Sequence, residues 1–503
     1  MIPLRCAGEG TCAAVRQYLD EAGYKEAAIL ERLRLGAMHE VLSGKRVRDG
    51  WRPLDLIGRL ANVFLLGHPA LRDELAADVP EGPLAAMEET GLLAAHGHKQ
   101  GAVCAGACLY PVGDIYVASD RLNTPDGSPF QAPDDVVYPA ITKNTSAFLR
   151  LLPSSPCEEM LELCAGTGVA ALTALHAGCC QRAWATDIAE RSVRFAEFNG
   201  RLNGLSGLEA LVSDVYAGVE EQTFDRIVAH PPYVPSRTSK WLYRDAGEAG
   251  EEITHKVIAG APEHLRPGGR LYCLAIGLEM KDEPLEQRLR QWLGAHSGEC
   301  DVALFELESY NPRDTVSQSV LAGQRSFHDY IYWRDWFEEA RVERCFYGMM
   351  VVQKHDAPRR SFTIRRDAGP RTTSREIEWL LDWETRCMDP AVVRRLLGRA
   401  PVAAEGLRLQ VTHEFQEGSL VPSAFQLQTD HPFEMTCGIQ PWTAQVIARC
   451  DGSSTVQQIL DYCRNEELIR GEVEAEDFAI LMRMLVSSGF VTFAEPTSPQ
   501  AAG

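Results

Sequence analysis

The sequence predicts an α/β protein whose central part is a doubly wound, parallel sheet. From about residue 159 to residue 354, apolar runs of strand length alternate with runs that carry apolar residues at helical spacing. Strands separated by helices of this length pair in parallel through right-handed crossovers. The chain has 503 residues, which is too long for one hydrophobic core, so further domains are expected to flank the sheet.

Seven strands and four helices are expected in the central part. The expected strands are Glu159–Cys164, Arg182–Ile188, Leu208–Val215, Phe224–His230, Gly269–Ile276, Asp301–Leu307 and Tyr347–Lys354. The expected helices cover about 168–177, 190–203, 250–265 and 283–294. This alternation predicts a seven-stranded, Rossmann-like sheet.

The flanking segments differ in pattern from the centre. Residues 1–112 are expected to form a mainly helical, winged-helix-like domain, and 401–503 a winged-helix-like α+β domain. Residues 113–356 would hold the sheet, and 357–400 a linker and a helix. Helical runs are expected at Gln17–Arg34, Leu54–Leu66, Leu84–Leu93, Glu376–Leu397, Trp442–Arg449, Val456–Arg464 and Glu476–Ser488. Winged-helix units bind nucleic acid or protein equally well, so they define no function by themselves.

The charge balance disfavours some classes of function. Fifty basic against seventy acidic side chains give a formal net charge of −20, which disfavours a general binder of nucleic acids or acidic membranes. The segment 359–375 is a local exception, because it contains Arg359, Arg360, Arg365, Arg366 and Arg371. Such a charge run is more often a solvated loop, yet it leaves a nucleic-acid partner open.

Cysteine usage and hydropathy indicate the compartment. The fifteen cysteines lack the paired spacing of a zinc site, so no metal is expected. A disulfide framework is not expected in so long a chain without a secretory leader. No apolar run approaches the ~20 residues that a membrane helix needs. These features predict a reduced, cytoplasmic protein with no membrane partner.

Acidic side chains close three successive strands of the predicted sheet. Glu162 lies at the end of the first strand, before the turn Cys164-Ala165-Gly166-Thr167-Gly168, whose glycines let the backbone approach a ligand closely. Asp187 follows the second strand, where a carboxylate accepts from both hydroxyls of a ribose, and Asp214 follows the third, in reach of an adenine amino group. Each acid has a structural alternative as a cap or turn residue. The turn also fits the dinucleotide pattern G-x-G-x-x-A, so both NAD and S-adenosylmethionine remain open at this point.

The end of the fourth strand distinguishes these two cofactors. There the sequence reads Ala229-His230-Pro231-Pro232-Tyr233, and the turn Leu265-Arg266-Pro267-Gly268-Gly269 precedes the next strand. About residues 115–355 resemble the class I S-adenosylmethionine-dependent methyltransferases whose fourth strand ends in (Asn/Asp/Ser)-Pro-Pro-(Tyr/Phe/Trp). The likeness is greatest to the group of release-factor glutamine methyltransferases and small-domain RNA guanine methyltransferases. The flanks resemble those of uncharacterised bacterial proteins built around such a domain.

The resemblance implies S-adenosyl-L-methionine as cofactor and a nitrogen as methyl acceptor. The cofactor-binding candidates are Glu162, Cys164, Ala165, Gly166, Gly168, Asp187, Ile188, Asp214, Val215 and His230. His230, Pro231 and Tyr233 are the catalytic candidates. A planar nitrogen is a poor nucleophile, so its N–H groups must be held by a side-chain acceptor and a rigid prolyl carbonyl while an aromatic ring stacks on its plane. In-line transfer then depends largely on positioning.

His230 departs from the family pattern. A neutral imidazole offers one acceptor nitrogen where Asn or Asp offers an oxygen, and its ordinary pKa of about 6.5 also suits a base. The structural alternative is a packed strand-end residue in a protein whose acceptor has changed. Two neighbouring segments also resemble the family: Tyr243–Gly250, which is expected to close over substrate, and Pro129–Asp135, which is expected to cap the cofactor.

The sequence therefore supports an N-methyltransferase, with a protein or peptide glutamine as the first candidate substrate. Amino groups of adenine or guanine in RNA or DNA are the second candidate. A cofactor-binding interaction protein without catalysis and an NAD-dependent oxidoreductase are the alternatives of other classes.

Overall fold

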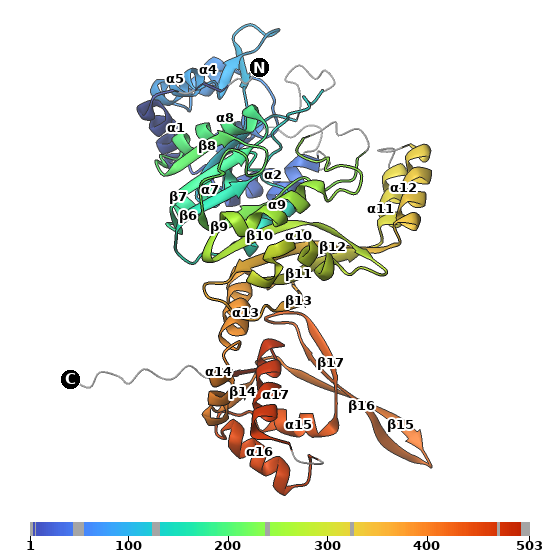
Figure 1. Cartoon of the computed structure of the whole chain (residues 1–503). Coiled ribbons are helices and arrows are strands. Elements are labelled where there is room, and N and C mark those ends of the chain that lie inside the picture. Colours follow the sequence, from blue (N-terminus) through green and yellow to red (C-terminus); the bar gives the residue numbers. More distant parts are fainter. Residues whose placement is uncertain are drawn as a thin grey trace, which may run out of the picture. The chain divides into compact units, whose positions relative to one another are not determined.

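The computed structural model describes residues 4–5, 7–43, 55–122, 131–236, 242–321, 326–469 and 473–493 (Figure 1). The chain forms two compact units. One consists of Met1–Val302 and Tyr310–Ala357, and the other of Ala303–Ser309 and Pro358–Gly503. In the described part of the chain, no helix is long and apolar enough to cross a membrane. Every cysteine in the described ranges is a free thiol.

A mixed sheet forms the centre of the first unit. Its strands follow the order β12-β10-β9-β6-β7-β8. Their bounds are β6 Cys157–Leu163, β7 Cys180–Asp187, β8 Leu208–Val212, β9 Phe224–Ala229, β10 Leu265–Met280 and β12 Val342–Lys354. Parallel pairing joins β8, β7, β6, β9 and β10, as the alternation predicted. β12 pairs antiparallel to β10, which corrects the expectation of a wholly parallel sheet, because strand direction depends on the connection and not on hydrophobic periodicity.

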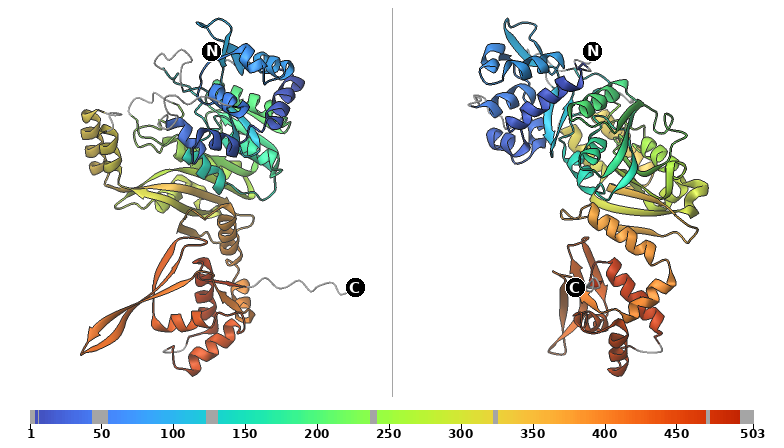
Figure 2. Two further views of the ribbon diagram at one scale, coloured as in Figure 1. Left: turned by 180° about the vertical axis from the view of Figure 1, so that it is seen from behind. Right: turned by 90° about the vertical axis from the view of Figure 1, so that its left-hand side faces the viewer.

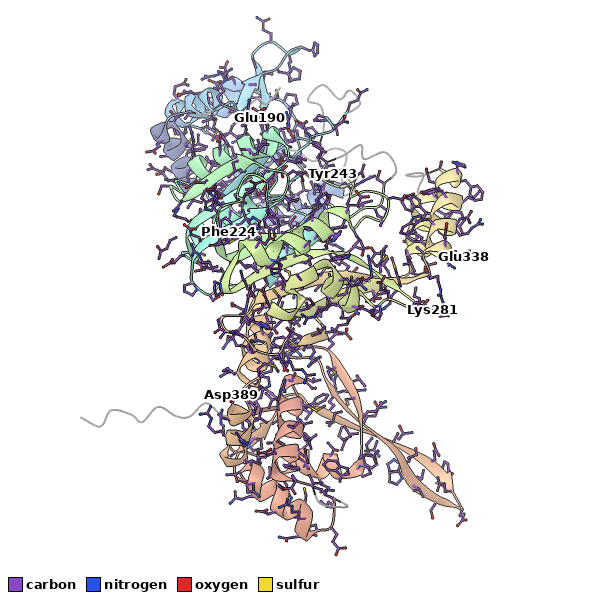
Figure 3. All side chains as sticks on the ribbon, in the orientation of Figure 1. Glu190, Phe224, Tyr243, Lys281, Glu338 and Asp389 are labelled. Carbon is purple, nitrogen blue, oxygen red and sulfur yellow. The ribbon has the colours of Figure 1, made fainter. Side chains whose placement is uncertain are left out.

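Helices connect these strands at the predicted places. They are α7 (Val169–His176), α8 (Glu190–Leu202), α9 (Glu252–His264) and α10 (Leu285–Trp292), followed by the 3-10 helix η2 (Gly294–Glu299). α6 (Lys143–Leu151) precedes β6, and Figure 3 labels Glu190 at the start of α8 and Phe224 at the start of β9. β11 (Cys300–Tyr310) is the remaining predicted strand. The helices α11 (Pro312–Leu321) and α12 (Phe327–Glu339) lie between β11 and β12 in the chain.

The N-terminal segment is helical, with short ribbons. Its elements are α1 (Glu9–Glu21), α2 (Glu26–Leu33), η1 (Met38–Ser43), α3 (Leu56–Phe64), β1 (Ala70–Leu71), α4 (Arg72–Ala76), α5 (Glu81–Glu89), β2 (Leu93–Ala95), β3 (Ala102–Ala105), β4 (Cys108–Val112) and β5 (Ile115–Ser119). The run expected as one helix at Gln17–Arg34 is two helices, because Gly23 adopts φ +70° and ends α1. β4 and β5 form an antiparallel hairpin.

Helix α8 joins this hairpin to the sheet (Figure 2). The Asn199 side chain accepts from the backbone N–H of Ala118 at 2.7 Å and donates to its carbonyl at 3.0 Å. Asn203 does the same for Tyr116, at 2.9 Å and 2.7 Å. The two amides therefore satisfy the edge of β5 much as a neighbouring strand would. Phe195 of the same helix lies in one continuous core with the N-terminal helices.

Two buried side chains near the hairpin hold the segment that follows it. Asp120 accepts from the Val137 N–H at 2.9 Å and from Arg191 Nε at 2.7 Å, and its second oxygen pairs with the same guanidinium. The Tyr110 hydroxyl accepts from the Ala140 N–H at 2.7 Å. Hydrogen bonds through Tyr110 and Asp120 therefore fix residues 137–140 to β4, to the end of β5 and to the first turn of α8.

The second unit is an α+β unit with its own core. Its elements are β13 (Thr363–Asp367), α13 (Ser374–Arg386), α14 (Pro390–Arg395), η3 (Leu396–Gly398), β14 (Pro401–Ala403), β15 (Arg408–Gln416), β16 (Ser419–Thr429), β17 (Met435–Ile439), α15 (Pro441–Ala448), α16 (Val456–Asn465), α17 (Ala475–Ser487) and β18 (Val491–Phe493). β14 pairs with β18, and β15, β16 and β17 form a second sheet. The helix expected over 376–397 is interrupted, because Asp389 caps a new helix whose first residue is Pro390.

Three arginines of the segment 359–375 have partners within this unit. Arg365 forms an ion pair with Glu306, and Arg371 pairs with Asp430. Arg366 donates to the Ser487 carbonyl at 3.1 Å. Part of the segment is the strand β13, which lies beside β11. These three side chains thus form contacts within the unit. The number of charges in the sequence does not show which arginines have such partners.

We expect Asp120→Ala to destabilise the first unit by about 3–5 kcal/mol, because it leaves the partly buried Arg191 guanidinium and the Val137 N–H without their acceptor. Arg194→Ala, which removes an exposed ion pair from the same helix, is the matched control and should cost less than about 1 kcal/mol. Urea unfolding of both variants measures the difference, and equal losses would contradict the assigned role of Asp120.

Candidate cofactor and acceptor site

A cavity of about 460 Å³ lies at the carboxyl ends of β6, β7, β8 and β9. It brings together nearly all residues singled out in the sequence: Glu162, Cys164, Ala165, Gly166, Asp187, Ile188, Asp214, Val215, His230, Pro231 and Tyr233. Gly168 is not part of the lining. The neighbouring strand ends meet at one edge of the sheet because the four strands are parallel.

The glycine turn explains why Gly168 faces elsewhere. Cys164, Gly166 and Gly168 all adopt left-handed backbone conformations, with φ of +54°, +55° and +75°. A Cβ on Gly166 would meet no atom within 4 Å, so the backbone is open at that point. A Cβ on Gly168 would lie 3.0 Å from the Ala196 Cβ of α8. Gly168 therefore permits the close approach of α7 and α8, and Gly166 the open turn.

Glu162 holds the start of α7. Its carboxylate accepts from the backbone N–H groups of Ala170 at 3.2 Å and Ala171 at 2.7 Å, which have no partner within the first turn of the helix. Burial raises the pKa of Glu162 to about 8, and the nearby Asp187 adds to the rise, while the two N–H groups oppose it. The side chain fixes the turn on which the cavity depends.

Asp187 joins the turns that follow β6 and β7. One carboxylate oxygen accepts from the Gly166 N–H at 2.9 Å and the other from the Ala189 N–H at 2.9 Å. The helix-capping alternative is not realised, because Ala189 is the N-cap residue of α8 and no side chain of the described residues caps this helix; Asp187 bonds the two turns instead. Burial raises the pKa of Asp187, against these hydrogen bonds. The next residue, Ile188, is 54% exposed in the cavity and offers an apolar surface beside the carboxylate.

Asp214 closes the third strand end. Its carboxylate is half exposed and lies 3.3 Å from Lys256 Nζ of α9. An ion pair so open to solvent is weak, so Asp214 stays available to a ligand. Val215 has φ +55°, and this conformation turns the chain away from the sheet after the acid.

His230 lies among aromatic rings. Its ring centroid is 5.3 Å from that of Phe148 and 5.8 Å from that of Tyr233. No hydrogen bond joins either ring nitrogen to the described residues. Burial lowers the pKa of His230 to about 4, so the ring is neutral at physiological pH and keeps one acceptor nitrogen.

Tyr233 is fixed at both ends. Asn144 Nδ2 donates to the Tyr233 hydroxyl at 2.6 Å. The carbonyl of Tyr233 lies 2.8 Å from where a Cβ on Gly250 would be, so only glycine fits there without a shift of the backbone. Burial raises the pKa of Tyr233, although hydrogen bonds with Asn144 and Tyr347 oppose the rise.

The loop Tyr243–Gly250 pairs with the residues that follow the two prolines. Val234 N–H donates to the Arg244 carbonyl at 2.9 Å, and Ser236 N–H to the Gly247 carbonyl at 2.8 Å. Immediately after the loop, the buried Glu251 accepts from the Leu278 N–H at 2.7 Å and pairs with Arg288. The loop is thus anchored at β10 and at the segment that follows His230–Tyr233; we call His230–Tyr233 the ledge.

Three residues that line the cavity beside the ledge were not predicted from the sequence. Tyr138, Asn144 and Phe148 line the cavity, and the Tyr138 ring stacks on Tyr243 with centroids 5.1 Å apart. The available signal was Thr142, which caps α6 by accepting from the Thr145 N–H at 3.0 Å and so places Asn144 in the first turn. Of the segment expected to cap the cofactor, Asp135 lines the cavity, whereas Pro129 and Phe130 lie outside the described residues.

Acidic side chains outnumber basic ones in the lining of the cavity. The carboxylates are Asp135, Glu162, Asp187, Asp214 and Asp245. One lysine or arginine side chain, Arg244, is found among the described residues of the lining. Its Nε donates to Asp245 at 2.9 Å. Among the described residues, His, Cys, Asp and Glu form no group that would hold a metal ion.

Comparison with known proteins assigns this site to a class. Residues 138–301 match the family model described as methyltransferase small domain. The chain therefore contains a methyltransferase small domain, whose class uses S-adenosylmethionine.

Curated relatives and a solved structure each match part of the chain. The chain is 29% identical over 157 residues to the ribosomal protein uL3 glutamine methyltransferase of Bradyrhizobium diazoefficiens, covering 29% of this chain and 49% of that protein. It is 32% identical over 190 residues to the release factor glutamine methyltransferase of Cereibacter sphaeroides, covering 35% and 66%. The crystal structure of a methyltransferase from Pyrococcus furiosus matches with a TM-score of 0.28 and 20% identity, covering 43% of this chain and 84% of that one. The chain thus spans about half to two thirds of the length of these curated relatives.

We expect Gly168→Ala to weaken binding of S-adenosylhomocysteine and to destabilise the protein by about 1–3 kcal/mol more than Gly178→Ala. Both glycines have positive φ, but only at Gly168 does an added Cβ meet another helix. Calorimetric titration and urea unfolding test this difference. Equal behaviour of the two variants would show that backbone strain alone, and not helix contact, requires Gly168.

His230 should titrate near pH 4 in the folded protein, because burial disfavours its charged form. The unfolded chain takes up this proton near pH 6.5, so His230 contributes stability above pH 6.5 that is lost as the pH falls toward 4. NMR of protein with ¹³C-labelled histidine measures the midpoint, with His230→Asn to assign the resonance. A midpoint near 6.5 would contradict the burial of the ring.

Proposed function

We propose that the chain is an S-adenosylmethionine-dependent N-methyltransferase that acts on a planar amide or amino nitrogen. One observation carries the proposal: a single cavity holds the open glycine turn, Asp187, Asp214 and the His230–Tyr233 ledge. The acids suit ribose and adenine, and the ledge suits a planar nitrogen. An NAD-dependent oxidoreductase would have no use for the two prolines and Tyr233 in hydride transfer. Their presence therefore disfavours that class.

The residues of the cavity fit the cofactor. Asp187 would accept from the ribose hydroxyls, and Asp214 from the adenine amino group. Ile188 and Val215 would contact the adenine ring, since the Ile188 side chain presents apolar surface inside the cavity. The open backbone at Gly166 admits close approach. When bound, the cofactor would supply a methyl group activated by its sulfonium, and in-line attack on the methyl carbon would release the thioether.

The ledge would orient the acceptor nitrogen. The neutral His230 ring accepts one N–H, the prolyl carbonyl accepts the other, and Tyr233 stacks on the plane of the amide. With the cofactor bound, the nitrogen would form a bond to the methyl carbon as the carbon–sulfur bond breaks, and would then lose one proton. The His230 ring is neutral at physiological pH, so its unprotonated nitrogen could receive that proton.

A protein or peptide glutamine is the first candidate substrate. The curated relatives are named as glutamine methyltransferases. The acidic lining disfavours a phosphate-rich substrate near the site. Adenine or guanine amino groups in nucleic acid are the second candidate, favoured by the arginines of 359–375. A steep fall of nucleic-acid binding with salt would distinguish this case.

The flanking parts extend the proposal. We take 113–356 as the catalytic domain, 1–112 and 401–503 as winged-helix-like domains and 357–400 as linker and helix, in a cytoplasmic protein. The antiparallel sheet of β15, β16 and β17 and the helices α15, α16 and α17 support the winged-helix-like assignment of 401–503. A cofactor-binding protein without catalysis is the alternative of another class.

Incubation of a cell lysate with the protein and methyl-labelled cofactor, followed by separation into protein, RNA, DNA and small molecules, tests the function. We expect label in the protein fraction, on a glutamine side chain. Measurable cofactor binding without any labelled product would support the interaction protein instead, and label in RNA or DNA would support the second substrate.

His230→Ala should lower the transfer rate at least about 100-fold, and His230→Asn should restore much of it by returning an acceptor. The rate of the wild type should stay level from pH 8 to about pH 5, since the His230 pKa is about 4. His296→Ala, at an exposed position, is the control. Full activity of His230→Ala would remove His230 from the site.

A further inference from the structure

Large apolar side chains at the end of α11 and the start of α12 are exposed to solvent. Leu321, at the end of α11, is 88% exposed and Phe327, at the start of α12, is 67% exposed. The Phe327 ring stacks on Tyr330 with centroids 5.8 Å apart. Figure 1 shows α11 and α12 projecting as a pair beside β12, and Figure 2 shows the same from behind. We call Leu321, Phe327, Tyr330, Glu338 and Glu339 the α12 surface.

The opposite face of α12 accounts for its packing, and Tyr330 is partly buried against the same apolar cluster, so Phe327 is the large hydrophobic side chain of α12 that stays exposed. Trp333 and Phe337, one helical turn apart, are buried against Leu278, Val342 and Cys345. Apolar area left in water on a helix that is already packed is typical of a contact surface.

Carboxylates accompany the exposed rings. α12 carries Asp329, Asp335, Glu338 and Glu339. Its arginine, Arg334, is engaged by the adjacent Asp335 at 2.6 Å. Glu338 and Glu339 are exposed, and Figure 3 labels Glu338 on this helix. The surface is therefore both aromatic and anionic, which suits lysine and arginine side chains through ion pairing and cation–π contact.

The α12 surface is connected to the acceptor side of the cavity. Tyr332 of α12 donates its hydroxyl hydrogen to Glu248, in the loop whose residues Tyr243–Asp245 line the cavity. Ala249 of the same loop packs into the apolar cluster of α12. A chain that inserts one side chain beside Tyr233 and continues over this loop reaches α12.

We propose that the α12 surface docks a cationic segment of the polypeptide substrate, adjacent in sequence to the methylated side chain; this rests on the proposed function. Carboxylates line both the cavity and α12, so the same charge preference holds along the whole path. A polyanion would be repelled at both places. The substrate class is thus a basic protein or peptide.

Two dye-labelled synthetic peptides of equal length, with a central glutamine flanked by lysines or by glutamates, test the docking. Fluorescence anisotropy with the full chain and S-adenosylhomocysteine should give at least about 10-fold tighter binding of the lysine peptide at low salt. The difference should collapse in 0.5 M salt, as for exposed charges. Equal binding of the two peptides would overturn the proposal.

Variants of the α12 surface locate the binding. Leu321→Ser with Phe327→Ser, and Glu338→Lys with Glu339→Lys, should each weaken the lysine peptide at least about 5-fold while binding of S-adenosylhomocysteine is unchanged. Met484→Ser, which removes another exposed side chain, and Glu220→Lys with Glu221→Lys are the matched controls. Unchanged peptide binding by the α12 variants overturns the proposal. So does a dimer in sedimentation that Phe327→Ser abolishes without effect on the peptide, because a second copy is then the occupant.

The two proposals fail separately. Mass spectrometry of the peptides after incubation with S-adenosylmethionine records methylation independently of binding. If the lysine peptide binds through α12 and no protein or peptide is methylated, the proposed function fails and the docking surface stands. If both peptides are methylated equally well by wild type and α12 variants, the function stands and the docking surface fails.

Discussion

The close packing around helix α8 is the constraint on which the rest of the first unit depends. A Cβ on Gly168 would lie only 3.0 Å from the Ala196 Cβ of this helix, so the turn after β6 packs closely against α8. At the start of the helix, Asp187 bonds both the Ala189 N–H and the Gly166 N–H. One helix thereby fixes the distance between the first two strand ends, and this distance sets the shape of the cavity.

The same helix explains why the N-terminal segment belongs to the site. Asn199 and Asn203 bind the edge of β5, and Arg191 pairs with Asp120. Asp120 in turn holds Val137, in the wall of the cavity. A segment far from the motifs in sequence thus determines where one wall lies, because buried polar groups must find partners wherever the chain places them.

Apolar surroundings and acidic charge act together at the acceptor side. Phe148 and Tyr233 lie against the His230 ring, and burial keeps this ring neutral with one nitrogen able to accept a hydrogen bond, as the proposed function requires. The carboxylates elsewhere in the cavity lining disfavour an anionic ligand. In the second unit, acidic partners engage Arg365 and Arg371, so a basic run in the sequence does not translate into a basic surface at these positions.

By itself, the sequence determined the strands, the helices between them and the motif at each strand end. Hydrophobic periodicity and glycine, proline and carboxylate positions are local, and parallel strands bring their carboxyl ends to one edge. Only the tertiary structure decided that Gly168 faces a helix and that Asp187 joins two turns. It also decided that β12 runs antiparallel and that Asn144, Phe148 and Tyr138 complete the cavity. These features depend on contacts between segments that are far apart in the sequence. Local sequence patterns do not report such contacts.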